Sequence, residues 1–135
     1  MSQKDSFKGS TYTVTHCKNA KKSLAEALLS VKADKRSKML NSINLQLQRL
    51  ADGKRSPDIS SRMEGQLPSY QGKPKKNFCA IKRNPVRCYY WESERFEMTY
   101  FVSHYIKKDF DKLSASDSER VCNNWDRIEG GTDDY

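Results

Sequence analysis

The segment from Gly65 to Trp91 carries six basic residues and no acidic residue. A solvent-exposed strand surface normally mixes both charges, so an acid-free run is typical of a site for phosphates. The alternative is a basic surface that serves only solubility. The six residues are Lys73, Lys75, Lys76, Lys82, Arg83 and Arg87. The net charge of +8 for the whole chain favours a polyanionic partner, a nucleic acid in the first place and an acidic protein in the second.

Arg87 lies in a segment rich in aromatic residues, "VRCYYW". In a strand, alternate residues share a face, so Arg87 is expected on the same face as Tyr89 and Trp91. The other face would carry Val86, Cys88 and Tyr90. Two interpretations follow for Arg87: it contributes to an RNA-binding surface with aromatic stacking partners, or its stem packs on core rings.

A second candidate group lies in "FVSHYIKKDFDK", which carries His104, Tyr105, Lys107, Lys108 and Lys112. The ordinary pKa of histidine is near neutrality, so His104 beside a phosphate could exchange a proton with substrate. A purely structural hydrogen-bonding role is the alternative. Tyr105 is expected on the opposite face of the strand, unless the strand ends or bulges there.

Other kinds of chemistry are not indicated. The four cysteines, at positions 17, 79, 88 and 122, form no C-x-x-C pair and show no metal spacing with histidine, so free, mostly buried thiols and no metal or cofactor are expected. A buried Cys88 thiol should have a raised pKa, which argues against a nucleophile. We find no signal peptide and no stretch long enough for a membrane span, and we expect a cytoplasmic protein.

The periodicity predicts one α+β domain over residues 11–129, preceded by a flexible leader (1–10) and followed by an acidic tail (130–135). A strand is expected over 11–17. Two apolar helical faces follow, and they indicate an αα-hairpin or one kinked helix that ends near Gly53. The two faces are Leu24, Leu28 and Val31, and then Leu40, Ile43, Leu47 and Leu50.

The second half of the chain reads as an antiparallel meander and a helix. One short strand is expected among the turns of 56–76, and then strands "NFCAIK", "VRCYYWES" and "MTYFVSHYI". A final helix should begin at Ser114 or Ser116 and bury Val121, Trp125 and Ile128. The expected fold is therefore a small antiparallel sheet with helices packed on one face, which leaves the cations on the open face.

This order of elements resembles the RelE/ParE toxin superfamily, and its HigB-like members most. "AIKRNPVRCYYW" is similar to the family's hairpin with an arginine ahead of x-x-Y, and "SHYIKKDFDKLSASDSERV" to its H-x-F-x-K-K-x-x-K strand end and following capped helix. The resemblance spans about residues 12–128. It implies a RelE-like fold and a toxin of a toxin–antitoxin system, which cleaves mRNA on the ribosome by attack of the ribose 2′-OH on the adjacent phosphate.

The resemblance also implies site residues and partners. Arg87 would bind the scissile phosphate with Lys82 on the preceding strand, and His104 or Tyr105 would transfer protons or stack on a base. RNA-binding residues would be Lys75, Lys76, Arg83, Lys107 and Lys108. The partners would be a cognate antitoxin, the ribosome and mRNA. The alternatives are a non-nuclease relative, either a ParE-like gyrase inhibitor or an inactive homologue, and an unrelated basic nucleic-acid-binding module.

Overall fold

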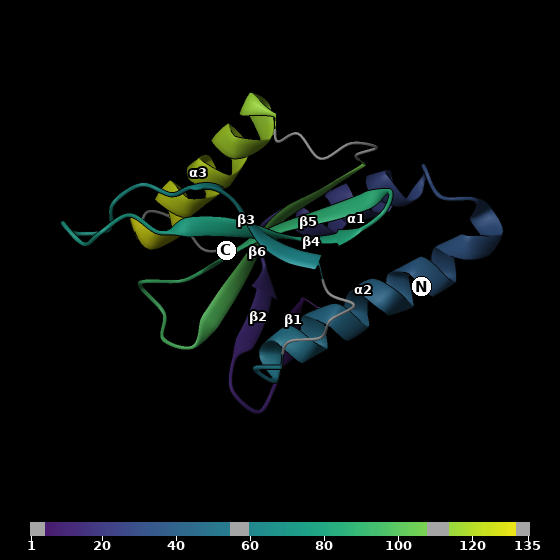
Figure 1. The fold of residues 1–135 in the computed structure, drawn as a ribbon, viewed down its shortest axis with the longest axis horizontal. Helices are drawn as coiled ribbons and strands as arrows, with labels where there is room; N and C mark the ends of the chain where they lie inside the picture. Colours follow the sequence, from purple (N-terminus) through teal and green to yellow (C-terminus); the bar gives the residue numbers. More distant parts are fainter. Residues whose placement is uncertain (1–4, 55–59, 108–113, 132–135) are drawn as a thin grey trace.

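The computed structural model describes residues 5–54, 60–107 and 114–131, with the backbone alone for residues 60–63. Within these residues, one six-stranded sheet has the strand order β1-β2-β6-β5-β4-β3 (Figure 1). The strands are β1 (Ser6–Lys8), β2 (Thr13–His16), β3 (Ser60–Gln66), β4 (Asn77–Arg83), β5 (Val86–Glu92) and β6 (Thr99–Lys107). The helical segments are α1 (Ala20–Leu28), η1 (Ala33–Lys35), α2 (Arg36–Ala51) and α3 (Ala115–Glu129).

The N-terminal part of the sheet differs from the expectation in two ways. Residues 6–8, expected within a flexible leader, form β1, which pairs antiparallel with β2 and buries Phe7. In addition, β2 runs parallel to β6, so the sheet is mixed and not antiparallel. Pairing between Val14 and Tyr100 joins distant parts of the chain, and local periodicity carries no information about such a pairing.

The helical region confirms two helices in place of one kinked helix. Arg36, the first residue of α2, donates from Nε to the carbonyl oxygens of Leu28 and Val31, both at 2.9 Å. These carbonyls belong to the last residue of α1 and to the connection after it, where backbone acceptors lack partners within the helix. The end of α2 is also as predicted, because Gly53 adopts the left-handed conformation at φ 71° directly after it.

Strands β4, β5 and β6 confirm the predicted meander, with a two-residue turn at Asn84 and Pro85. One irregularity changes the direction of side chains near the end of β6. Tyr89 pairs with His104 but Tyr90 pairs with Val102, so Ser103 is the extra residue of a β-bulge.

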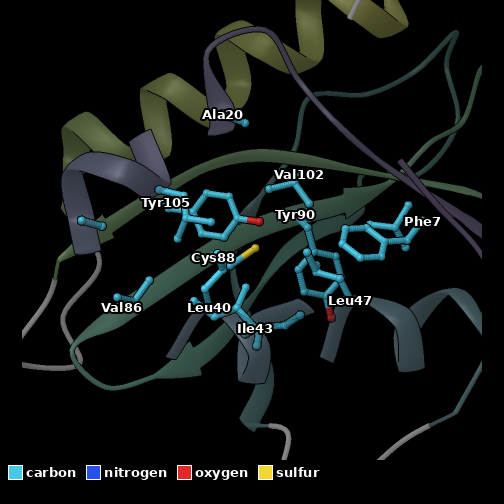
Figure 2. Close-up of a cluster of buried hydrophobic side chains, with 14 of the residues drawn as sticks. Phe7, Ala20, Leu40, Ile43, Leu47, Val86, Cys88, Tyr90, Val102 and Tyr105 are labelled. Atoms are coloured by element: carbon cyan, nitrogen blue, oxygen red, sulfur yellow. The ribbon is translucent and has the colours of Figure 1, made fainter. Parts of the chain in front are cut away.

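The two faces of the sheet carry separate cores, and the alternation predicted for β5 is confirmed. The core under α1 and α2 contains Val86, Cys88 and Tyr90, together with Ile43 and Leu47 of α2 (Figure 2). The core under α3 contains the other set from β5, Tyr89 and Trp91, together with Val121, Trp125 and Ile128.

Helix α3 has the predicted start and the predicted buried face, but its position corrects the expectation of an open face. Ser114 is the N-cap, and its hydroxyl accepts from the backbone N–H of Asp117 at 3.1 Å. Because α3 packs on the face opposite α1 and α2, helices cover both sides of the sheet (Figure 1). The face that carries Arg87 is therefore buried, and Arg87 itself is 2% exposed.

Candidate functional site

Two of the predicted catalytic cations lie side by side on the face of the sheet that α3 covers. Lys82 of β4 and Arg87 of β5 are directly paired across the two strands. Glu64, at the bulge of β3, reaches both: its Oε1 lies 3.7 Å from Lys82 Nζ and 3.9 Å from Arg87 Nη1. The side chains of Lys82, Arg87 and Glu64 are 8%, 3% and 6% exposed. A buried carboxylate therefore offsets part of the charge of these two cations.

The contact of Glu64 with the two cations is loose. Both nitrogen–oxygen distances exceed the usual length of a charge-assisted hydrogen bond, about 2.7–2.9 Å. Among the described residues, Glu64 Oε1 is also a buried oxygen that accepts no hydrogen bond. The Glu64 carboxylate therefore lies between two cations without forming a short ion pair with either of them.

His104 lies on the same face and connects the sheet to α3. Its Nε2 is 3.2 Å from Asp117 Oδ1, and its Nδ1 is 2.8 Å from Ser103 Oγ. Burial lowers the pKa of His104 to about 4, with a further contribution from the positive charge of Arg120, while Asp117 acts in the opposite direction. The ring is therefore neutral at pH 7. The neutral form that satisfies both contacts donates from Nε2 to Asp117 and accepts at Nδ1 from the Ser103 hydroxyl.

The bulge in β6 makes this arrangement possible. Because Ser103 is the extra residue, Ser103 and His104 both lie toward α3, where Asn124 Nδ2 donates to Ser103 Oγ at 2.9 Å. Regular alternation would have placed only one of the two there. Ser103 and Asn124 were not among the predicted site residues, since a single inserted residue leaves no mark in the pattern of apolar positions.

Tyr89 separates Arg87 from His104 on this face. The rings of Tyr89 and His104 have centroids 5.2 Å apart, and Phe78 contacts Tyr89 edge-on at 5.9 Å. Burial raises the pKa of Tyr89, while the Arg87 guanidinium two residues away acts in the opposite direction. We name the set formed by Glu64, Lys82, Arg87, Tyr89 and His104 the polar face cluster.

Tyr105 lies on the opposite face, as the alternation predicted. Its hydroxyl is 2.7 Å from His16 Nε2, and its backbone N–H donates to Ser23 Oγ at 2.9 Å. The other ring nitrogen of His16, Nδ1, lies 3.0 Å from the carbonyl oxygen of Asp5, so it must donate. His16 Nε2 then accepts from Tyr105. The two neighbours His104 and Tyr105 thus lie on different faces, and of the two only His104 shares the face that carries Arg87.

The remaining predicted RNA-binding residues do not gather at the polar face cluster. Arg83 points toward α2, where its Nε donates to Ser42 Oγ at 2.8 Å. Lys76 directly precedes the first residue of β4, at the other end of this strand from Arg83. It pairs with Glu94 at 2.7 Å, and the Glu94 carboxylate raises the pKa of Lys76. Lys75 is exposed beside it, and Lys107 is exposed at the end of β6. Lys108 lies outside the described residues.

Metal and thiol chemistry receive no support from the described part of the chain. It contains no group of three or more histidine, cysteine or acidic side chains placed to hold a metal ion. All four cysteines are free, and burial raises the pKa of Cys17 and of Cys88 to about 12, as expected for Cys88. No helix in the described ranges is long and apolar enough to cross a membrane.

Comparisons with known proteins add no assignment. No family model, no curated protein and no solved structure matches this chain.

Proposed function

We propose that this protein is a toxin of the RelE/ParE type, which inhibits translation by cleaving ribosome-bound mRNA in the cytoplasm. The observation that carries the proposal is the placement of Lys82, Arg87 and His104 on one face of three adjacent strands. Cleavage of a phosphodiester by its own 2′-OH needs cations to stabilise the phosphate, a base for the hydroxyl and an acid for the leaving oxygen, and these three residues could supply the cations and the base.

The chemistry assigns a role to each group. The 2′ oxygen attacks phosphorus and the P–O5′ bond breaks, which gives a 2′,3′-cyclic phosphate and a 5′-hydroxyl. Lys82 and Arg87 would stabilise the negative charge that develops on the phosphate. His104, neutral at pH 7, would act as the base that accepts the proton of the 2′-OH. A protonated group must then act as the acid that donates a proton to the leaving O5′ oxygen.

Access to these groups requires a rearrangement. Glu64 lies between the two cations, so the scissile phosphate would replace its carboxylate, and Asp117 of α3 would have to separate from His104. The loose contact of Glu64 supports such an exchange, because an incoming phosphate can form shorter charge-assisted hydrogen bonds to both cations. The described conformation is then the closed state of the enzyme.

The order of elements supports a RelE-like architecture. After the added strand β1, the chain forms a strand, two helices, the strands of the predicted meander and a final helix, which is the order implied by the resemblance. The proposal includes a cognate antitoxin that is acidic where it contacts the basic surface. Such a partner would also keep the toxin inactive until it is released.

A binding-only relative is the second candidate, and a specific observation favours it. His104 is completely buried and Arg87 is nearly so. If the His104 and Arg87 side chains stay buried, they stabilise the fold and do not contact a substrate. A gyrase inhibitor or an inactive homologue would then bind its target through other surfaces.

Induced expression in a bacterial host, followed by mapping of mRNA 5′ ends, separates the two candidates. The nuclease proposal expects growth arrest with new in-frame cleavage sites for the wild type, and neither for a folded His104→Gln variant. His16→Gln is the matched control, because His16 is the other buried histidine and lies under α1. Circular dichroism checks that both variants fold. Growth arrest without new 5′ ends would refute the nuclease, and unaltered growth would refute the toxin.

A further inference from the structure

A groove rich in lysine lies at the end of the β4–β5 hairpin, away from the centre of the sheet. It is bounded by the connection between α1 and α2, the first turns of α2 and the turn at Asn84 and Pro85, and its volume is about 750 Å³. Among the described residues that line it, none is acidic. Five are basic, namely Lys32, Lys35, Lys38, Lys82 and Arg83. We name it the basic groove.

Two arginines hold the walls of the basic groove in place. Arg36 ties the start of α2 to the carbonyls of Leu28, at the end of α1, and of Val31, which fixes the connection carrying Lys32 and Lys35. Arg83 ties the end of β4 to Ser42 of α2 at 2.8 Å. The groove is therefore a built feature of the fold and needs no ligand to form.

The local charges in the groove are unfavourable for the protein alone. The N-terminal end of a helix carries partial positive charge, and anions stabilise it. The helical segment begins at η1, whose first turn carries Asp34, and it continues directly into α2, whose first turn contains Lys38 and no acidic residue. Lys32, Lys35 and Lys38 are exposed, and within the described residues none of them lies within ion-pairing distance of a carboxylate. Asp34 is exposed in the same connection but does not line the groove.

We propose that the basic groove binds the sugar-phosphate backbone of RNA, as a second contact beside the polar face cluster. An anion there would offset the charge of the three exposed lysines. No aromatic side chain is among the described lining residues, so the groove contacts phosphates and does not stack on bases. An acidic protein segment would present carboxylates to the same lysines, and its binding is one outcome of the test.

Lys82 marks the border between the basic groove and the proposed catalytic face. It is among the residues that line the groove, but its side chain is 8% exposed and its Nζ lies 3.7 Å from Glu64 in the polar face cluster. The exposed cations of the groove are therefore Lys32, Lys35 and Lys38, and Arg87 lies on the other face of the sheet. The inference rests on the proposed function in one respect: the proposed function identifies the bound polyanion as RNA.

The test measures binding of a fluorescent single-stranded RNA oligonucleotide by anisotropy over a range of salt concentrations. The groove variant is Lys35→Glu/Lys38→Glu, and the matched control is Lys18→Glu/Lys22→Glu, two exposed lysines away from the groove. Each double variant lowers the net charge from +8 to +4, since each substitution removes two charges. The groove variant should lose about tenfold in affinity or more, and its salt slope should fall by about 1.4, the value for two phosphate contacts on a single strand. The control should stay close to the wild type.

Three results would overturn the inference: equal losses in the two double variants, no binding of the RNA by the wild type at low salt, or equal displacement of the RNA by an oligo-glutamate peptide. The outcome is independent of cleavage, because the proposed enzyme cuts mRNA on the ribosome and the binding assay contains the oligonucleotide alone. Cleavage in cells without a selective groove effect would refute the groove alone. A selective groove effect without cleavage would refute the nuclease and leave the groove in place.

Discussion

The burial of His104 predicts that acid destabilises the protein well above the pH at which carboxylates titrate. The ordinary pKa of 6.5 falls to about 4 in the folded protein because the ring is buried under α3. Between these two values the unfolded chain binds a proton at this position and the folded chain does not. Stability therefore rises with pH across this window. The contribution is complete above pH 6.5 and is lost as the pH falls toward 4.

The size of the effect follows from the two pKa values. The gap between 6.5 and about 4 corresponds to about 3 kcal/mol, at about 1.4 kcal/mol for each pKa unit. This is a large share of the 5–15 kcal/mol that is typical for a domain. Burial also lowers the pKa of His16, which adds a pH dependence of the same sign. The charged groups that act on His104 are Asp117 and Arg120 of α3, which oppose each other.

Urea unfolding between pH 4 and 7 measures this dependence directly. The wild type should lose stability through the whole window, and His104→Gln should lose much less over the same range. His16→Gln keeps the His104 contribution and should retain most of the slope. The comparison uses slopes, because either substitution also changes stability at pH 7. A titration of His104 by NMR with a midpoint at or above 6.5, or a full slope in His104→Gln, would refute the reasoning.

Two further substitutions test the buried ion pairs and the helix cap. Glu64→Gln should lower the free energy of unfolding by about 3 kcal/mol, and Tm by about 10 °C, because Lys82 and Arg87 lose the acid between them. The exposed Glu97→Gln is its control and should change stability by less than about 0.5 kcal/mol, so equal Tm values for the two would contradict the assignment. Ser114→Ala should cost about 1 kcal/mol in urea unfolding, since the first turn of α3 loses a hydrogen bond, and an unchanged midpoint would contradict the cap.

The spacing of apolar residues predicted the helices and most of the strands, because each of these elements depends on residues that are close together in the sequence. The spacing of Val121, Trp125 and Ile128 predicted the buried face of α3, and Ser114 its start. Alternation along β5 predicted which side chains share a face, and burial on both faces did not disturb it. The opposite directions of His104 and Tyr105 followed from the same alternation, although the bulge at Ser103 decides which face each one takes.

The long-range parts of the structure could not be predicted in the same way. The position of α3 on the sheet depends on packing between Trp125 and partners far away in the sequence, so a face that looked open is covered. Parallel pairing of β2 with β6 has no local signal either. Asp117 could be identified only as an acid in the first turn of a helix, and its contact with His104 required the tertiary fold.

The acid-free run shows why counting charges over a segment is a weak guide to a surface. Glu64 directly precedes Gly65, and β3 returns it to the cations of β4 and β5. Glu94 follows the run and does the same for Lys76. Antiparallel strands bring the ends of a run back over its middle, so acids just outside the run balance cations inside it.

Within the described residues, a group of exposed lysines without a carboxylate partner lies in a different part of the sequence. "KADKRSK" reads as a break between two helices, yet its lysines at positions 32, 35 and 38 remain exposed on one groove beside the end of a helix. A pair such as Lys82 and Arg87 that is buried against an acid serves stability until an anion competes for it. Exposed lysines that have no acidic partner can attract a phosphate without first losing an ion pair. In the proposed function, the basic groove would make the first contact with RNA, and the polar face cluster would hold the phosphate that is cleaved.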